Sequence, residues 1–343
     1  MTSVKGKLFE YFVYKLLLFS GFKKVVPDKL LVYKGAAGTM VQGLGQAHNA
    51  DVLLEPPFQT PLYFPTRLLV ECKCYNDTIG VPVVRNAFGL REDINNFDVV
   101  TKEILENRCS SYTTKPTYYR MKRYTYQVAV ASMSGFKSTA IPFALAHRIP
   151  LISFGNSVLF ANLRNIIEEV EKVAIEKEEV AKGILEHIKE QQDETYISDM
   201  DYCLCESFER FLDEIESFRD KIVIGLLEDG TILFMVKQKY DYYTANKRNQ
   251  RRYNDGCAIY WNSRHLAWEL YDEEQCYSFE LPEEIYKQWI ESSEERIEDA
   301  ISIKQQYFSN IVLFENDMET GEMVRTVRLS EEFIRNAKRR LRQ

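Results

Sequence analysis

The first segment with a regular pattern of apolar positions is residues 7–19. Apolar side chains recur at Leu8, Phe12 and Leu16, and again one residue later in each case. This spacing places two adjacent rows of apolar side chains on one side of a helix. Gly21 follows, and glycine commonly ends helices because it adopts the left-handed conformation readily. The pattern predicts a buried first helix that ends at Gly21.

The next apolar segments are shorter and favour strands. Runs over 30–33, 52–54 and 68–75 are bounded by Gly, Pro and Asn, which is typical of strands. The intervening 55–67 holds four prolines and is predicted to be a loop. Helical spacing returns over 81–97, with a proline in the first turn, where a helix tolerates it.

A strand, a helix and a second strand follow over 127–133, 134–149 and 150–154. This order predicts a right-handed crossover and a parallel pair of strands. Pro142 lies near the start of the predicted helix and removes one backbone hydrogen bond, so the boundary of that helix is not fixed by the pattern. The first half of the chain is therefore predicted to be α/β.

Residues 160–195 are acidic, with apolar side chains along one side of a predicted helix. These side chains are Leu163, Ile166, Ile167, Val170, Val173 and Ala174. Two interpretations remain open: a helix packed on a neighbouring domain, or a coiled coil that pairs two copies of the chain.

After residue 201 the chain consists mainly of short β-rich runs, which predict an α+β module. Its expected features are a hairpin around EDG, three further short strands, a helix from Pro282 to about Phe308, a second hairpin around METG, and a last helix opened by Ser330. We expect three regions: 1–158, an acidic helical connector over 159–200, and 201–343.

Composition indicates a globular protein without a membrane span. The chain has 343 residues, 45% of them hydrophobic and 28% charged, and no apolar run reaches the roughly 20 residues of a transmembrane helix. The N-terminal segment is interrupted by Glu10 and Lys15 and is predicted to be a folded helix, not a signal peptide. Seven irregularly spaced cysteines favour reduced thiols and a cytoplasmic location.

Charge is distributed unevenly between the two halves. The formal net charge is −7, but residues 1–155 contain 19 Lys and Arg against 11 Asp and Glu, a net +8 that leaves −15 for the remainder. Only the first half is electrostatically suited to phosphate groups.

The stretch LLVECKCYNDTIG, residues 68–80, has an acidic residue, a basic residue and two thiols in four consecutive positions. Strand alternation puts Val70, Cys72 and Cys74 on one face, and Glu71 and Lys73 on the other. The two thiols lack the partner Cys or His pair that a tetrahedral zinc site requires, so we interpret them as buried free cysteines.

A third charged residue, Asp51, makes a functional role for Glu71 and Lys73 more plausible than a surface ion pair. Asp51 ends the Gly-rich stretch GLGQAHNAD and begins another short strand. Two carboxylates and a lysine at one sheet edge suit phosphodiester hydrolysis. The carboxylates can hold a hard cation that polarises phosphate and water, and the ammonium can orient the water.

The ordered motifs resemble the PD-(D/E)XK nuclease superfamily and, within it, the Mrr-like (type IV) restriction endonuclease group. They are GxxFE (Gly6, Phe9, Glu10), GF (Gly21, Phe22), GxGxxHxxD (Gly43, Gly45, His48, Asp51), LLVECK, VPVVRNAFG and the closing strand-helix-strand. The resemblance covers about residues 5–155. It implies a restriction endonuclease-like core, a mixed central sheet flanked by helices.

The resemblance also implies a site. Asp51, Glu71 and the main-chain carbonyl of Cys72 would ligate Mg²⁺, with Mn²⁺ as a substitute. Lys73 would position or activate the attacking water, and Glu10 would help to bind metal or water, unless it is simply a helix glutamate at a solvated edge. The sequence departs from the family in having no proline before Asp51 and in its long Pro-rich insertion, and neither departure removes a catalytic group.

Further residues are candidates for contact with nucleic acid. Gln46 and His48 precede Asp51, and Arg85 and Asn86 begin the predicted helix at 81–97; His48 could instead orient a neighbour, and Arg85 could form a surface ion pair. Residues 114–126 interleave tyrosines with Lys115, Arg120, Lys122 and Arg123, which suits backbone contact or a solvated loop. Two basic islands lie at 246–253 and 335–343.

The sequence therefore predicts a cytoplasmic, Mg²⁺-dependent endonuclease that hydrolyses DNA with a metal-activated water, in restriction or anti-phage defence. We expect double-stranded DNA as substrate, a homo-oligomer with the connector helix as a candidate interface, a protein partner through the C-terminal region, and no membrane association. Two alternatives remain: a nuclease fold that binds nucleic acid or a protein without cutting, and an assembly protein whose cleavage is gated by a partner.

Overall fold

The structure is a computed structural model of the whole chain. The residues it describes are 4–28, 31–35, 38–59, 63–97, 124–155, 157–193, 196, 203–238, 255–264, 266–272, 275–282, 285–286, 301, 305–317 and 321–340.

The first helix, α1 (Val4–Phe19), confirms the helical pattern at the N-terminus. It ends as predicted: Gly21 has φ +89°, and the N–H of Phe22 donates to the carbonyl of Leu17 at 3.1 Å. This left-handed glycine turns the chain sharply at the end of the helix. The stripe at Leu8, Phe12 and Leu16 is fully buried.

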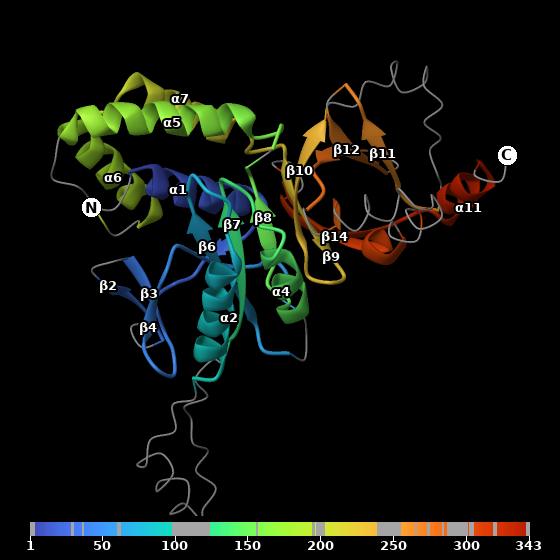
Figure 1. Cartoon of the computed structure of the whole chain (residues 1–343), viewed down its shortest axis with the longest axis horizontal. Helices are drawn as coiled ribbons and strands as arrows, with labels where there is room; N and C mark the ends of the chain where they lie inside the picture. Colours follow the sequence, from blue (N-terminus) through green and yellow to red (C-terminus); the bar gives the residue numbers. More distant parts are fainter. Residues whose placement is uncertain are drawn as a thin grey trace, which may run out of the picture.

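Beside α1 lies a five-stranded mixed sheet in the order β1-β5-β6-β7-β8 (Figure 1). The strands are β1 (Lys23–Lys24), β5 (Val52–Glu55), β6 (Thr66–Lys73), β7 (Thr125–Ser132) and β8 (Leu151–Ser153). β1, β5 and β6 pair antiparallel, whereas β6, β7 and β8 pair parallel. The predicted parallel pair is confirmed, and it is joined through α4 (Ala140–His147), which is shorter than the predicted helix.

Helices cover both faces of this sheet. The side chains of Val70 and Cys72 on β6 belong to the apolar cluster that includes α1. Leu69, on the alternate face, belongs to the cluster with α2 (Val81–Asn95) and α4. The restriction endonuclease-like architecture, a mixed central sheet flanked by helices, is therefore present.

A separate three-stranded meander is inserted between β1 and β5, two neighbouring strands of the central sheet. It consists of β2 (Val32–Gly35), β3 (Gly38–Gln42) and β4 (Ala47–Ala50) in antiparallel pairs. Only β2 was predicted. The sequences GTMVQ and AHNA have few apolar positions and are mostly half-buried, so hydrophobic patterning did not reveal β3 and β4.

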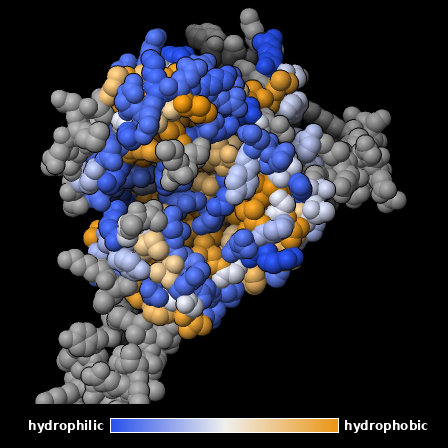
Figure 2. Space-filling model, turned by 60° about the vertical axis from the view of Figure 1, so that its left-hand side comes forward, coloured by the Kyte–Doolittle hydropathy of each residue, from blue (hydrophilic) through white to orange (hydrophobic). Residues whose placement is uncertain are grey.

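The connector consists of two helices, α5 (Ala161–Glu176) and α6 (Glu178–Gln192), instead of the single predicted helix over 160–195. The helical conformation is interrupted at Lys177, whose dihedral angles of φ −129° and ψ 100° are extended. The upper part of the face shown in Figure 2 is mostly hydrophilic, with smaller hydrophobic patches. The apolar face of α5 packs on α1 and α7 (Glu206–Glu216) of the same chain. That face is therefore covered, which corrects the expectation that it could pair two copies.

The C-terminal half contains a seven-stranded antiparallel sheet in the order β11-β12-β13-β10-β9-β14-β15. The strands are β9 (Ile222–Leu227), β10 (Ile232–Gln238), β11 (Ala258–Asn262), β12 (Ala267–Tyr271), β13 (Cys276–Phe279), β14 (Asn310–Asp317) and β15 (Gly321–Arg328). These strands correspond to the predicted β-rich runs. Both predicted hairpins, β9-β10 and β14-β15, are present.

This second sheet curls until its two edges meet. Cys257, just before β11, forms a parallel bridge with Leu329, just after β15. Helix α11 (Glu331–Arg340) begins at the same point, where Ser330 Oγ accepts the N–H of Phe333 at 3.0 Å, as expected for the residue that opens a helix. Of the helix predicted over 282–308, residues 285–286, 301 and 305–308 are helical, and 287–300 and 302–304 lie outside the described residues.

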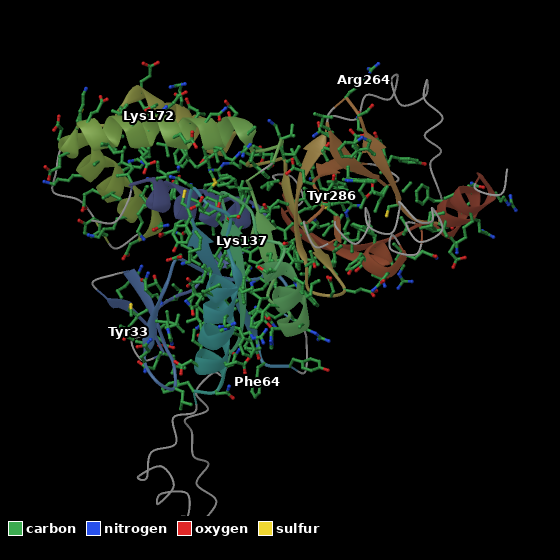
Figure 3. All side chains as sticks on the ribbon, viewed as in Figure 1. Tyr33, Phe64, Lys137, Lys172, Arg264 and Tyr286 are labelled. Atoms are coloured by element: carbon green, nitrogen blue, oxygen red, sulfur yellow. The ribbon has the colours of Figure 1, made fainter. Side chains whose placement is uncertain are left out.

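One continuous apolar cluster connects the two halves. Phe234 of β10 contacts both Phe154 and Phe160, and Phe22 contacts Phe314 of β14, with ring centroids 5.4 to 6.4 Å apart. Side chains fill the space between α1, the first sheet and the second sheet (Figure 3). The division at residues 158 and 200 stays a prediction, but the two sheets pack against each other through this shared core.

Within the described part of the chain, the helices are too short or too polar to cross a lipid bilayer.

Candidate functional site

The candidate site forms where β5 and β6 pair. Val52 pairs with Val70 in antiparallel register, which places Asp51 and Glu71 next to each other across the two strands. Asp51 Oδ2 accepts the backbone N–H of Cys72 at 2.9 Å. This bond ties Asp51, which precedes its strand, to the end of β6.

Lys73 lies between the two carboxylates. Its Nζ is 2.7 Å from Glu71 Oε2 and 3.7 Å from Asp51 Oδ2. The side chains of Asp51, Glu71 and Lys73 are 14%, 19% and 21% exposed. Three charged groups predicted from sequence are thus brought together and largely withdrawn from water, yet each can still be reached.

The carboxylates carry more negative charge than their surroundings neutralise. Burial and the nearby charge of Asp51 raise the pKa of Glu71, although Lys73 and His48 act in the opposite direction. Burial alone would lower the pKa of Lys73, but the charges of Glu71 and Asp51 raise it above its usual value. Lys73 is therefore a cation near neutral pH.

Glu10 of α1 belongs to the same electrostatic group. Burial and the charge of Asp51 raise its pKa to about 7, despite opposing effects of Lys7 and Lys73. Lys7 Nζ donates to Glu10 Oε2 at 2.5 Å, one turn away on the helix. Glu10 is thus a half-buried group at the site, not a freely solvated helix glutamate.

Cys72 at the end of β6 and Cys74 just after it are free thiols, the first buried and the second half-buried. Cys72 is buried among apolar side chains, and burial and the charge of Asp51 raise its thiol pKa well above the usual value. Burial also raises the pKa of Cys74 to about 12. Neither thiol is a thiolate at neutral pH, so neither can act as a zinc ligand without losing a strongly held proton.

The oxygen atoms around Asp51 and Glu71 are of the kind that a divalent cation such as Mg²⁺ prefers. No cluster of three or more His, Cys, Asp or Glu side chains in the described ranges is arranged to hold a metal by itself. The carboxylates of Asp51 and Glu71 could each offer an oxygen, and the main-chain carbonyl of Cys72 could offer a third. Burial and, after it, the charge of Asp51 raise the pKa values of Glu71 and Glu10, and a hard cation at this position would stabilise both carboxylates in their ionised form. The residues therefore fit a divalent cation coordinated by oxygen.

The Gly-rich motif is held by a residue that sequence reasoning missed, Asp93 of α2. Asp93 Oδ1 accepts the N–H of Gly45 at 2.8 Å, and its Oδ2 lies 2.7 Å from His48 Nε2. A Cβ on Gly43 would overlap Asp93 Oδ2 and lie 2.7 Å from the carbonyl oxygen of Gln46. The glycines of the motif thus allow close approach of Asp93. The sequence showed that Asp93 lies on a helix, next to the buried Ile94. It did not show that Asp93 meets His48, because the two residues are 45 positions apart.

The other predicted nucleic-acid contacts are distributed more widely. Gln46, Arg85 and Asn86 are exposed. Among the described residues Arg85 has no ion-pair partner, and its guanidinium carbon lies 5.9 Å from the ring centroid of Phe143 on α4. The structure does not place these residues in contact with the carboxylates, and their role stays a prediction.

The remaining basic candidates cannot be placed at the site. Lys115, Arg120, Lys122, Arg123 and the island at 246–253 lie outside the described residues. The described part of the other island belongs to α11, at the opposite end of the molecule from β2, β3 and β4 (Figure 1).

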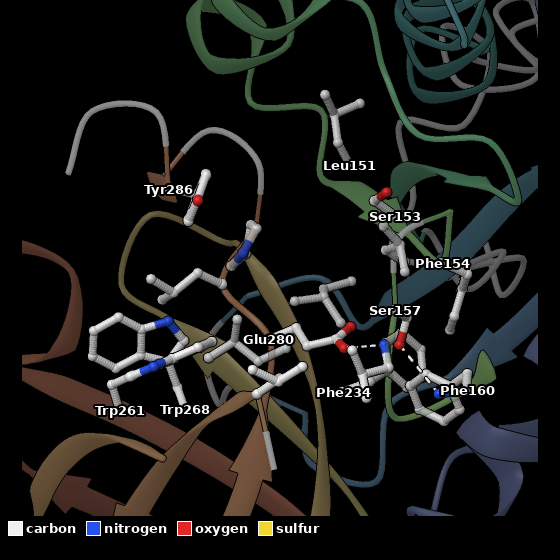
Figure 4. Close-up of a pocket in the computed structure, with 17 residues that line it drawn as sticks. Leu151, Ser153, Phe154, Ser157, Phe160, Phe234, Trp261, Trp268, Glu280 and Tyr286 are labelled. Carbon is white, nitrogen blue, oxygen red and sulfur yellow. Dashed lines mark hydrogen bonds between the residues drawn. The ribbon is translucent and has the colours of Figure 1, made fainter. Parts of the chain in front are cut away.

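A pocket of about 330 Å³ lies elsewhere, between β8 and the curled sheet (Figure 4). Its walls include Phe154, Trp261, Trp268 and Tyr286. Among the described residues that line it, Glu280 alone is acidic or basic, and it accepts the N–H groups of residues 158 and 159. The pocket lacks paired acid and base groups, so the carboxylate cluster is the stronger candidate for chemistry.

Similarity to a known family lies in the N-terminal part of the chain. Residues 1–102 match the family model Mrr_cat, described as a restriction endonuclease. No curated protein gives a significant match. One solved crystal structure, of the protein of unknown function AF1548, is 15% identical and covers 54% of this chain and 97% of its own. Its TM-score of 0.28 is too low to indicate a shared fold. Residues 1–102 therefore resemble a restriction endonuclease domain of the Mrr type, which is consistent with a nuclease of the PD-(D/E)XK superfamily.

Proposed function

We propose that this protein is a metal-dependent endonuclease that hydrolyses phosphodiester bonds of double-stranded DNA. The observation that carries the proposal is the meeting of Asp51, Glu71 and Lys73 at the end of β6, with Lys73 Nζ 2.7 Å from Glu71 and 3.7 Å from Asp51. The family match adds a nuclease domain over residues 1–102, and such domains generally use divalent metal ions.

Each group has a distinct task in the proposed reaction. Asp51 and Glu71 would hold the cation together with the Cys72 carbonyl, and the bond from the Cys72 N–H keeps Asp51 in place. A bound divalent cation would supply Lewis acidity toward phosphate and water. Lys73, a cation within reach of both carboxylates, would orient the attacking water and stabilise the charge that develops on the phosphate.

Glu10 is suited to a supporting task. Its pKa of about 7 means that it can take up or release a proton near neutral pH. We expect it to bind water beside the reacting phosphate, or to contribute an oxygen to the cation.

Direct attack by water fits this site better than a covalent intermediate. Cys72, the nucleophilic side chain nearest to the three charged groups in sequence, is buried on the α1 side of the sheet and keeps its proton. We therefore expect a single in-line displacement, with inversion at phosphorus.

The decisive experiment compares the parent protein with Lys73→Ala on supercoiled plasmid in the presence of Mg²⁺. Loss of one preorganised charged donor costs about 10²- to 10³-fold in kcat, so the parent should nick or linearise the plasmid and the variant should not. The matched control is Lys137→Ala, which removes an exposed lysine on the loop before α4. This control should cut like the parent.

The result also separates the alternatives. If the parent binds plasmid tightly but cuts it with neither Mg²⁺ nor Mn²⁺, the nuclease fold serves binding alone. If cleavage starts only after a cellular fraction is added, a partner gates the site through the C-terminal half. The family match supports a role in restriction or anti-phage defence, which plating phage on cells that carry the parent or the Lys73→Ala protein would test.

A further inference from the structure

Helix α2 contacts the Gly-rich turn at residues 43–46 through one residue, Asp93. Asp93 lies near the end of α2, a helix that packs on the opposite face of the sheet from α1. Its side chain and backbone together accept hydrogen bonds from the turn at residues 43–46. The N–H of Gly45 donates to Oδ1 at 2.8 Å, and the N–H of Leu44 donates to the Asp93 carbonyl at 3.0 Å.

The second oxygen of Asp93 determines the state of His48. Asp93 Oδ2 lies 2.7 Å from His48 Nε2. The hydrogen bonds from His48 and Gly45 lower the pKa of Asp93, so the carboxyl is ionised at neutral pH and can only accept. His48 Nε2 must then carry the proton, and in the neutral ring Nδ1 is left as the acceptor.

His48 is close enough to the proposed site for its charge to influence it. The imidazole lies on β4, three residues before Asp51, and its charge lowers the pKa of Glu71. Its side chain is 18% exposed, so part of the ring faces solvent. Asp93 thus acts on a group beside the carboxylates from a helix that does not itself supply a predicted ligand.

We propose that Asp93 is a positioning residue for the phosphodiester hydrolysis: it fixes the place and tautomer of His48, so that His48 can contact the reacting phosphate or its water beside Glu71. This inference rests on the proposed nuclease function. It goes beyond it because it assigns a task to α2 and explains why Gly43, Gly45 and His48 occur together. Asp93 acts only through His48 and the turn.

The substitution Asp93→Asn tests this with almost no change in size. An asparagine has one acceptor oxygen, whereas Gly45 and His48 both require an acceptor. The amide must therefore either lose the bond from Gly45 or present its NH₂ group to His48. The second arrangement turns Nε2 into an acceptor and moves the proton to Nδ1. The matched control is Glu92→Gln on the same helix, where the side chain is 47% exposed and contacts Arg91.

Two measurements on the full chain decide the proposal. The first is the ¹⁵N NMR spectrum of histidine-labelled, metal-free protein, with the His48 signals assigned by their loss in His48→Gln. The parent and Glu92→Gln should show protonated Nε2, and Asp93→Asn should show either the other tautomer or a mixture. The second is plasmid cleavage kinetics: kcat should fall about 10- to 100-fold, as for groups that orient an active-site residue, with KM nearly unchanged.

A double variant tests whether Asp93 acts through His48. If it does, Asp93→Asn combined with His48→Gln should cleave no more slowly than His48→Gln alone. A thermal melt of each variant identifies a loss that comes from unfolding. An unchanged His48 tautomer and an unchanged kcat in folded Asp93→Asn would overturn the proposal while leaving the nuclease function intact. Absence of cleavage in the parent would refute the function instead, and the tautomer measurement would still decide whether Asp93 controls His48.

Discussion

Two regions of this molecule bury carboxylates beside cations, and they do so with opposite electrostatic results. At the end of β6, Asp51, Glu71 and Glu10 share Lys73 and Lys7, and the pKa values of both glutamates are raised. In the curled sheet, several donors surround one buried glutamate, Glu315. Lys237 Nζ lies 2.7 Å from it and Arg325 Nε lies 3.0 Å from it, and Tyr277 donates to it at 2.9 Å.

The balance of charge accounts for the difference. Burial alone would raise the pKa of Glu315, but the hydrogen bond and charge of Lys237, the charge of Arg325 and the Tyr277 hydroxyl together lower it. Glu315 is 2% exposed and fully compensated, so this network stabilises the sheet. The carboxylates near β6 are left with uncompensated charge, which is typical of a site prepared for a cation or substrate.

Matched substitutions give the largest expected contrast between the two regions. Glu71→Gln should reduce plasmid cleavage by at least about 10²-fold, since it removes a charged group that acts on the reaction. The free energy of unfolding should stay the same or rise, because repulsion with Asp51 is relieved. Glu315→Gln should leave two cations facing a neutral amide and lower the free energy of unfolding by about 3 kcal/mol.

Urea denaturation and plasmid cleavage of both variants measure these effects. The comparison fails if Glu71→Gln destabilises the protein as much as Glu315→Gln does. It also fails if Glu315→Gln abolishes cleavage in protein that remains folded.

The Gly-rich turn offers a second contrast, within the nuclease half. Gly43→Ala should destabilise the protein by about 1–3 kcal/mol, the usual cost of forcing a methyl group into packed atoms. The new Cβ would meet both Asp93 and the Gln46 carbonyl. Gly45→Ala should cost less, because its Cβ would lie 3.2 Å from Asp93 Oδ1. Thermal melts rank the two variants, and equal costs would show that Asp93 does not constrain Gly43.

The last contrast is in the pH dependence of stability. The pKa of Glu315 is lowered in the folded protein, so its contribution is complete above the unfolded value of 4.5 and is lost as pH falls below it. The pKa of Glu10 is raised from 4.5 to about 7, so folding takes up a proton between these values and its ionised form costs stability above pH 7.

Glu10→Gln should therefore stabilise the protein at pH 8 and have no effect below pH 4.5, whereas the penalty of Glu315→Gln should shrink as pH falls below 4.5. Urea denaturation from pH 4 to pH 8 tests both signs. A Glu10→Gln variant whose stability runs parallel to that of the parent across this range would contradict the raised pKa.

The elements with strong periodicity were predictable. The buried stripe of α1, the runs of β6, β7 and β8, and the two C-terminal hairpins follow from local patterning, because burial on one or both faces dictates the spacing of apolar residues. Strands β3 and β4 were not predictable, since their residues are half-buried and mixed in polarity. The break at Lys177 was missed as well, because the residues on both sides of it are good helix formers.

The amino-acid sequence by itself determined that Glu71 and Lys73 share one face of a strand and that Cys72 faces away from them, since side chains alternate along a strand. Only the tertiary structure decided the rest. Pairing of β5 with β6 brought Asp51 beside Glu71. The packing of α2 brought Asp93 to His48 across 45 residues, and curling of the second sheet brought Tyr277 of β13 to Glu315 of β14 across 38 residues. Each of these contacts joins residues far apart in sequence. A local pattern of apolar and polar residues does not show which distant side chain will lie beside a given one.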